Sequence, residues 1–103
     1  MPVCVLESDS ELEEIIEEYV IVYFTATWCG PCRQISPHYA RAAEENLTSQ
    51  LKFAKVDVDD LESSHVSAIP TFRVYKNSSV ADELVGADLE ALTTLIKKHC
   101  AST

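Results

Sequence analysis

The sequence predicts an α/β fold in which helices cover both faces of a mixed central sheet, giving a three-layer α/β/α sandwich. First, segments rich in β-forming residues alternate with segments of helical periodicity along most of the chain, as in folds whose parallel strands are joined by helices. Second, the last two β-rich segments follow one another across a short polar turn, which indicates an antiparallel hairpin. Third, 103 residues without a linker, repeat or low-complexity tract predict a single domain, residues 1–103.

The first half of the chain is predicted to contain two pairs of a strand and a helix. Apolar residues at helical spacing, opposite an acidic face, predict a helix that begins at Ser8, Asp9 or Ser10. The β-rich run that follows predicts the next strand. The expected elements are strand Val3–Leu6, a helix with Leu12, Ile15, Ile16 and Tyr19 on one face, strand Tyr19–Thr25, and a helix from about Cys32 to Asn46 that turns Ile35, Tyr39, Ala42 and Ala43 inward.

The second half is predicted to add three strands and two helices, of which the first helix is short. Asp88 can cap the start of the last helix. Basic residues in its last turn, Lys97, Lys98 and His99, suit the negative end of its dipole. The expected elements are strand Leu51–Val58, a short helix near Asp60–Ser64, strand Pro70–Tyr75, edge strand Val80–Val85, and a last helix with Leu89, Leu92, Leu95 and Ile96 inward.

The most informative stretch is Trp28-Cys29-Gly30-Pro31-Cys32, because it places two closely spaced thiols at the end of a strand. A thiolate is the nucleophile of disulfide exchange, and the free amides and dipole of a helix N-terminus stabilise it. With two residues between them in a first helical turn, the sulfurs can bridge without a large backbone shift. Pro31 suits that turn, and Gly30 lets a partner's backbone approach. We therefore predict a redox dithiol in which Cys29 attacks and Cys32 resolves; the alternative is two cysteines that pack as small apolar side chains.

The chain resembles the thioredoxin family over nearly its whole length. Besides the dithiol motif, the residues that carry the resemblance are Pro37, Val56-Asp57-Val58-Asp59, Ile69-Pro70-Thr71 and Gly86-Ala87. The resemblance implies the thioredoxin fold and a thiol–disulfide oxidoreductase that reduces protein disulfides through a mixed disulfide, with Cys29 exposed and Cys32 buried. It implies that Pro70 is a cis-proline facing the dithiol and that the backbone of Ile69 pairs with the substrate chain. The apolar docking surface that it implies around the nucleophile consists of Trp28, Gly30, Pro31, Ile69, Pro70, Gly86 and Ala87.

The chain departs from the family at Tyr23. Thioredoxins commonly carry a buried aspartate at this position, five residues before the tryptophan, which takes the proton of the resolving thiol through water. A phenol is a poor proton acceptor at neutral pH compared with a carboxylate. Tyr23 therefore either slows release of the mixed disulfide or fills space as a core aromatic. Lys55, which matches the lysine often found near that carboxylate, is retained, whereas the hairpin turn Lys76-Asn77-Ser78 lacks the family's usual glycine.

Charge and glycine content exclude several function classes. Acidic residues number 17 against 8 basic ones, a formal net charge of −9, so nucleic acid is not an expected partner. The seven acids from Glu7 to Glu18 form either a solvated helix face or a recognition face for a basic partner. Two glycines in the whole chain are too few for a dinucleotide fingerprint or a phosphate loop, so no cofactor is expected.

Electrons must then come from another protein. The resemblance implies an NADPH-dependent flavoprotein, thioredoxin reductase, as the donor. It implies disulfides of enzymes such as peroxiredoxins or ribonucleotide reductase as acceptors.

The N-terminus predicts a cytoplasmic protein. Met1–Leu6, followed by acids, lacks the basic start, apolar core and cleavage site of a secretory signal. The longest apolar stretch, Tyr19–Phe24, is far shorter than the roughly 20 residues that span a bilayer, so no membrane contact is expected. In a reducing compartment four cysteines indicate catalysis, here in electron transport and cell redox homeostasis, rather than structural disulfides.

Other chemistry-bearing residues give weaker signals. His38, His65 and His99 have no metal-ligand spacing, and Asp57, Asp59 and Asp60 lack the glycine and glutamate of a calcium loop, so strand-end polarity and capping explain them better. Cys4 is expected to pack as a small hydrophobe in the first strand. Cys100 is open to glutathionylation or intermolecular pairing if the tail exposes it.

Three functions follow from these observations. The leading hypothesis is a dithiol–disulfide oxidoreductase that serves as a general reductant. The alternative is a redox-inactive or weakly active module that uses the same apolar groove to hold a partner. A third interpretation, metal or iron–sulfur binding, has only one C-x-x-C in the chain and would need a dimer to supply four ligands.

Overall fold

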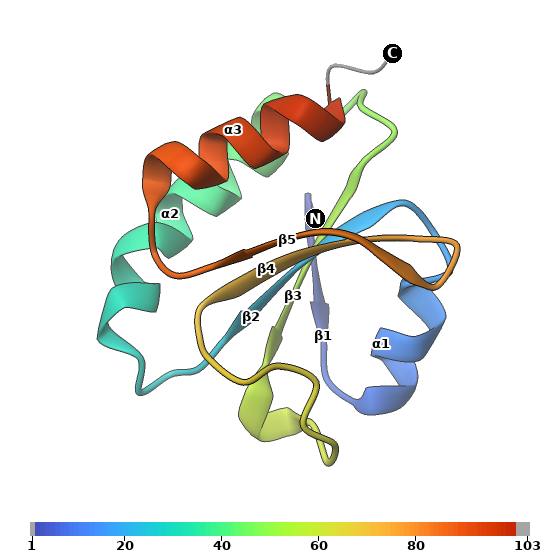
Figure 1. The fold of residues 1–103 in the computed structure, drawn as a ribbon, viewed down its shortest axis with the longest axis vertical. Helices are drawn as coiled ribbons and strands as arrows, with labels where there is room; N and C mark the ends of the chain where they lie inside the picture. Colours follow the sequence, from blue (N-terminus) through green and yellow to red (C-terminus); the bar gives the residue numbers. More distant parts are fainter. Residues whose placement is uncertain (1, 101–103) are drawn as a thin grey trace.

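The computed structural model, which describes residues 2–100, has a five-stranded mixed sheet between helices (Figure 1). Its elements are β1 (Val3–Leu6), α1 (Asp9–Ile15), β2 (Val20–Thr25), α2 (Gly30–Glu45), β3 (Lys52–Asp57), the 3₁₀ turn η1 (Val58–Asp60), β4 (Thr71–Lys76), β5 (Ser79–Val85) and α3 (Leu89–Cys100). The strand order is β1-β3-β2-β4-β5. The strands β1, β3 and β2 are parallel to one another. The strand β4 pairs antiparallel with β2, and β5 pairs antiparallel with β4. The predicted α/β/α sandwich is confirmed.

The central strand β2 supplies side chains to both layers of the core. Residues from Val20 to Phe24 are buried, and successive side chains point to opposite faces of the sheet. Ile21 and Tyr23 join the cluster under α2 and α3, whereas Val20, Val22 and Phe24 join the cluster under α1. Burial on both faces accounts for the uninterrupted apolar sequence of this strand.

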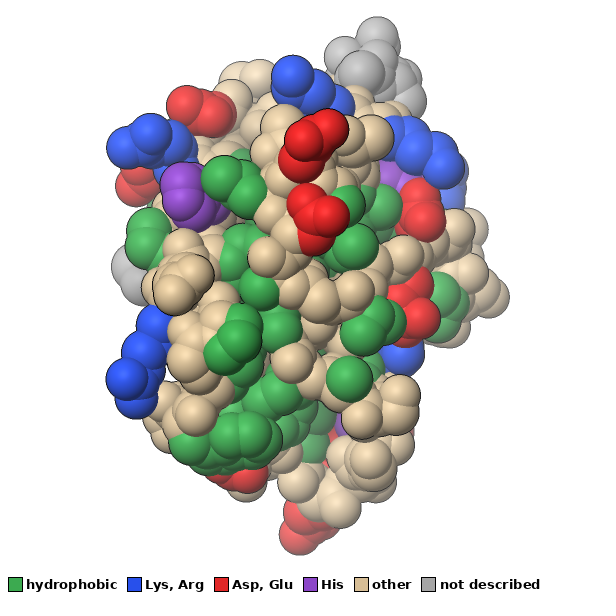
Figure 2. All heavy atoms as spheres, turned by 60° about the vertical axis from the view of Figure 1, so that its left-hand side comes forward, with side chains coloured by type: hydrophobic (Ala, Val, Ile, Leu, Met, Phe, Trp, Pro, Cys, Tyr) green, Lys and Arg blue, Asp and Glu red, His purple; other side chains and the backbone are tan. Residues whose placement is uncertain are grey.

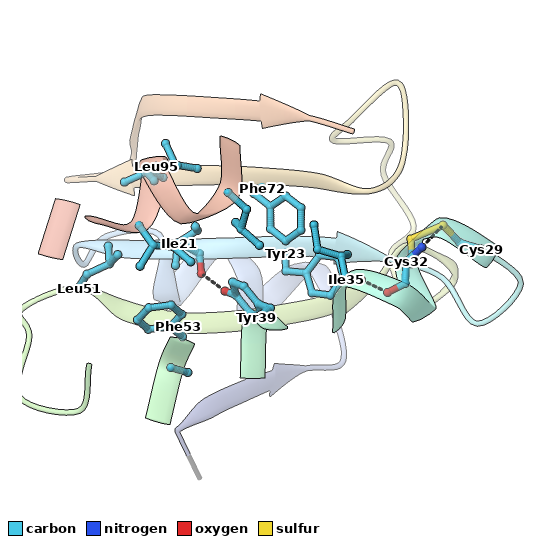
Figure 3. Packing of buried hydrophobic residues seen from close by; sticks show 14 of the residues in the cluster. Ile21, Tyr23, Cys29, Cys32, Ile35, Tyr39, Leu51, Phe53, Phe72 and Leu95 are labelled. Carbon is cyan, nitrogen blue, oxygen red and sulfur yellow. Dashed lines mark hydrogen bonds between the residues drawn. A yellow bond between two sulfur atoms is a disulfide. The ribbon is translucent and has the colours of Figure 1, made fainter. Parts of the chain in front are cut away.

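Tyr39 fastens α2 to the middle of the sheet (Figure 3). Its hydroxyl lies 3.0 Å from the carbonyl oxygen of Ile21 in β2 and 2.7 Å from that of Ala54 in β3, and its single proton is shared between the two acceptors. Burial raises the pKa of Tyr39 well above its ordinary value, so the hydroxyl keeps its proton and remains a donor. One side chain therefore ties the helix to two neighbouring strands.

Two helical predictions were wrong at their boundaries. The predicted helix from about Cys32 begins instead at Gly30, because Pro31 fits its first turn and Cys29 serves as the N-cap. The predicted short helix near Asp60–Ser64 is only the 3₁₀ turn η1. The amides of Glu62 and Ser63 donate to the Asp9 carboxylate rather than to the preceding turn of the chain.

Cys4 does not pack in the core as predicted, because its side chain is exposed. It lies on the edge strand β1, which pairs only with β3. Position in the sheet, and not residue type, decides the exposure of this thiol.

The hairpin between β4 and β5 forms without the glycine that such turns favour. Asn77 and Ser78 have φ angles of 54° and 66°, as the tight two-residue turns of hairpins require. The amide of Ser78 donates to the carbonyl oxygen of Ile16 at 2.8 Å. That contact, which comes from the backbone, joins the turn to Ile16, the C-cap of α1.

Replacing Tyr39 by Phe should lower the free energy of unfolding by about 1–3 kcal/mol, because two buried carbonyls lose a donor while the ring and its packing remain. Urea unfolding followed by circular dichroism measures this as a lower midpoint at an unchanged slope. A midpoint equal to that of the parent protein would show that the Tyr39 hydroxyl is not what fastens α2.

Candidate active site at the β2–α2 junction

The junction between β2 and α2 places the two cysteines of the motif in contact (Figure 3). Cys29 and Cys32 form a disulfide with their Cα atoms 5.3 Å apart. The amide of Cys32 also lies 3.2 Å from Cys29 Sγ, which accepts its hydrogen. Cys29 is 5% exposed and Cys32 1%, so the order of exposure agrees with the family pattern. The expected exposed nucleophile, however, is largely covered in this disulfide-bonded form.

The electrostatics at Cys29 favour a sulfur that carries negative charge. Cys29 is the N-cap of a 16-residue helix, and no acidic side chain lies in the first turn. The free amides and positive dipole end of such a helix stabilise a thiolate at this place. The first sulfur of the pair is therefore well placed for nucleophilic chemistry.

Trp28 is bonded to Asp59, which the sequence analysis attributed to strand-end polarity and capping and not to this contact. Its side chain is 64% exposed, yet its indole N–H donates to Asp59 Oδ2 at 2.8 Å. Asp57 caps η1 by accepting from the amide of Asp59, as predicted for these aspartates. The position of Asp59 directly after β3 was the available signal, but only the fold brings it to Trp28.

The other docking candidates lie in the first turn of α2, which carries the dithiol, and in the loops before β4 and after β5. The Ile69–Pro70 peptide bond is cis, as the resemblance implied. The amide of Gly86, at φ 113°, donates to the carbonyl oxygen of Pro70 at 2.9 Å and joins the two loops. Ile69 packs against the core cluster that contains both cysteines. Gly30, Pro31 and Ala87 are exposed, and Figure 2 shows hydrophobic side chains gathered on the lower part of one face with most charged ones around them.

Tyr23 is a buried hydrogen-bonding residue beside Cys32. Its ring is 1% exposed and stacks on Phe72 at 4.6 Å between centroids. Its hydroxyl donates to the carbonyl oxygen of Cys32 at 3.0 Å and lies 2.8 Å from Ser36 Oγ. Ser36 Oγ itself donates to the same carbonyl at 2.7 Å. The sequence analysis missed Ser36, which no motif marks.

Lys55 lies near the site, on the strand next to that of Tyr23. It lines a cavity of about 340 Å³ together with Cys32, Ser36, Asp57 and Asp60. Tyr23 lines a different cavity, of about 240 Å³, whose wall Lys55 also shares. Lys55 also pairs in register with Tyr23, the position of the family's carboxylate, so it is a neighbour of both that position and Cys32.

The remaining candidates are dispersed. His38 is exposed, while His65 pairs with Asp9 and His99 with Asp82. Within residues 2–100, no three His, Cys, Asp or Glu side chains gather as a metal site would need. Cys100 is half-buried against the core cluster. None of the described helices is long and apolar enough to cross a bilayer.

The comparison with known proteins agrees with this geometry. The sequence model of the thioredoxin family matches residues 3–98. The chain belongs to the thioredoxin family. It is 42% identical to thioredoxin 1 of Plasmodium falciparum, over 94% of this chain and 97% of that protein. Thioredoxin of Malassezia sympodialis superposes with a TM-score of 0.86 at 33% identity, covering 95% of this chain and 90% of that one.

A further solved relative comes from work on the thiol-resolving mechanism of a yeast mitochondrial 1-Cys peroxiredoxin via the glutathione and thioredoxin systems. It superposes with a TM-score of 0.80 at 28% identity, covering 93% of this chain and 94% of that one. With the family established and a closely spaced cysteine pair in place, this thioredoxin is a thiol–disulfide oxidoreductase that reduces protein disulfides.

The segment from Leu61 to Ile69 forms one wall of a cavity of about 340 Å³ beside Trp28. It contains no helix or strand, and the Asp9 carboxylate at the start of α1 holds it. Asp9 pairs with the His65 ring at 2.8 Å and accepts from two amides of the segment. These contacts, led by the hydrogen bond from His65, lower the pKa of Asp9 below its usual 3.8.

Replacing Asp9 by Asn should therefore make the free energy of unfolding depend less steeply on pH in the acid range. A carboxyl whose pKa is lower in the folded state stabilises the fold above its unfolded pKa, and this contribution is lost as the pH falls below about 4. Urea midpoints across the acid range measure the effect. Glu13→Gln, an exposed carboxyl on the same helix, is the matched control and should leave the curve as it is. An Asp9→Asn curve parallel to that of the parent would contradict the assignment.

Proposed function

We propose that Cys29 is the nucleophile and Cys32 the resolving thiol of this thioredoxin. Cys29 thiolate attacks one sulfur of a substrate disulfide, forms a mixed disulfide and releases the other substrate sulfur as a thiolate. Cys32 then gives its proton to solvent and attacks Cys29 Sγ as a thiolate, which releases the second substrate sulfur as a thiolate. Two electrons pass from the dithiol to the substrate, and the protein ends as the Cys29–Cys32 disulfide.

One observation carries this assignment of roles. Cys29 caps α2, and its sulfur accepts a backbone amide, so it occupies the place where a helix best stabilises a thiolate. Cys32 lies one turn into the helix and is the more deeply buried of the two. A substrate disulfide therefore reaches Cys29 first.

The substrate chain docks on the apolar surface around Cys29. The residues that form it are Trp28, Gly30, Pro31, Ile69, Pro70, Gly86 and Ala87. Pro70 has no amide hydrogen, which leaves Ile69 to pair with an extended substrate segment through its own backbone. The exposed indole of Trp28, held by Asp59, covers the substrate from the other side.

An NADPH-dependent thioredoxin reductase supplies the electrons, and enzymes such as peroxiredoxins or ribonucleotide reductase accept them. The relative solved in connection with a peroxiredoxin supports the first kind of acceptor. The protein works in the cytoplasm, in electron transport and redox homeostasis. The support for this location is that Cys4 and Cys100 remain free thiols, which suits a reducing compartment.

The assigned roles predict different outcomes for the two cysteine variants. Cys29→Ser should abolish the acceleration of insulin-disulfide reduction by dithiothreitol, because the thiol that attacks the substrate is lost. Cys32→Ser should accumulate mixed disulfides with insulin chains, detectable by mass spectrometry and released by added thiol. The opposite pattern, with trapping by Cys29→Ser, would reverse the roles.

The proposed donor predicts NADPH-dependent turnover. With NADPH and a thioredoxin reductase, the oxidised protein should support continuous NADPH consumption when insulin is present, and Cys29→Ser should not. If dithiothreitol reduces the protein and the flavoprotein does not, the oxidoreductase function stands and this donor is excluded.

A further inference from the structure

We infer that Tyr23 and Ser36 are positioning residues for the resolving step: their hydroxyls clamp the carbonyl of Cys32 and hold the first turn of α2 against the central strand. This inference rests on the proposed role of Cys32. It assigns Tyr23 a function different from the one its replacement of a carboxylate suggests, because the phenol acts here as a hydrogen-bond donor.

The clamp consists of three oxygen atoms within mutual hydrogen-bond distance. Tyr23 Oη lies 3.0 Å from the Cys32 carbonyl oxygen, Ser36 Oγ lies 2.7 Å from it, and the two hydroxyls are 2.8 Å apart. Each hydroxyl has one proton to donate and the carbonyl has none. Every arrangement of the two protons therefore gives the Cys32 carbonyl at least one hydroxyl donor, and donors in series strengthen one another.

The hydroxyls of Tyr23 and Ser36 have different roles in the clamp. Ser36 bonds back to the residue four positions earlier in its own helix, so this contact alone does not attach α2 to anything. Tyr23 comes from β2 and reaches across to the helix (Figure 3). The link between sheet and helix therefore passes through Tyr23, and Ser36 acts through it.

This link acts on a turn that the rest of α2 supports less well. Pro37 lies inside the helix and has no amide to donate to the carbonyl four residues earlier. Tyr39, the other anchor of α2, follows that proline in sequence. It bonds to Ile21 and Ala54 and so does not hold the turn before the proline. The turn that carries Cys32 thus depends on the Tyr23 ring, 1% exposed and stacked on Phe72.

Position matters most after the mixed disulfide has formed. Cys32 must then reach Cys29 Sγ, and an intramolecular attack is fast only if the two atoms are held in near-attack geometry. The first attack, by Cys29 on an external disulfide, has no such requirement on Cys32. Loss of the clamp should therefore slow the second step and leave the first unchanged.

Stopped-flow reaction with dithionitrobenzoate separates the two steps. The reduced full chain, carrying Cys4→Ser and Cys100→Ser so that only the dithiol reacts, is mixed with this aromatic disulfide at equal concentration. Attack by Cys29 releases one coloured thiolate, and attack by Cys32 on the mixed disulfide releases the second. In the same background Cys32→Ser should keep the first phase and lose the second, which tests the role of Cys29. The rate of the second phase in the dithiol protein tests the clamp, so the two proposals fail separately.

Tyr23→Phe should slow the second phase about three- to tenfold, the rate equivalent of one buried hydrogen bond, with the first phase unchanged. Ser36→Ala should slow it less, because Tyr23 can still reach the carbonyl. In the Tyr23→Phe background Ser36→Ala should have no further effect. Titration against glutathione should show the effective concentration of the dithiol reduced by the same factor as the second phase.

Tyr39→Phe is the matched control, because it removes a buried tyrosine hydroxyl from α2 away from the dithiol. It should cost stability and leave both phases unchanged. Equal slowing by Tyr39→Phe and Tyr23→Phe would overturn the clamp in favour of general softening of the helix. An unchanged second phase in Tyr23→Phe would also overturn it, and a shifted pH midpoint of that phase would assign Tyr23 to proton transfer instead.

Discussion

The geometry of the active site depends on how α2 is fastened to the sheet. Two tyrosine hydroxyls fasten it by bonding to backbone carbonyls: Tyr39 reaches from the helix to β2 and β3, and Tyr23 reaches from β2 to the helix. Backbone carbonyls are fixed by secondary structure, so these bonds locate the helix axis more firmly than contacts between side chains would. Tyr39 holds the middle of the helix, whereas Tyr23 holds its first turn. Because Cys29 caps that turn, its relation to Trp28 and to the Pro70 loop follows from the attachment that Tyr23 makes.

The site joins three parts of the chain that are distant in sequence. Asp59, after β3, holds the indole of Trp28. Pro70, before β4, is bonded to Gly86 after β5. All of these residues follow the end of a strand or lie in the loop before one, where the backbone is free to approach a ligand. The sheet thus fixes the positions of these loops, and the dithiol lies beside them.

Much of this could be predicted from the sequence because the decisive signals are local. The C-x-x-C spacing, Pro31 in the first helical turn and the apolar run of β2 each follow from neighbouring residues. Ser36 could not be found in this way, because a serine inside a helix is ordinary until a tyrosine from another element reaches it. The exposure of Cys4 depends on the edge position of β1. The predicted helix near Asp60–Ser64 does not form because Asp9, 53 positions from Glu62, binds the amides of that segment. These three features are set by tertiary contacts.

Tyrosine at position 23 changes the physical balance of the core next to the dithiol. A carboxylate buried here would have to shed its hydration, at a cost of several kcal/mol unless it is paired. Tyrosine avoids that cost and adds ring contacts with Phe72 and Tyr39 at 4.6 and 5.1 Å between centroids. It also changes the hydrogen-bonding character of the site. A carboxylate would offer an acceptor, whereas the Tyr23 hydroxyl acts as a donor and is already bonded to the Cys32 carbonyl and to Ser36. The residue that stabilises the core is therefore the one that orients Cys32, and any proton acceptor for the resolving thiol has to be sought elsewhere, in the cavity that Cys32 shares with Lys55, Asp57 and Asp60.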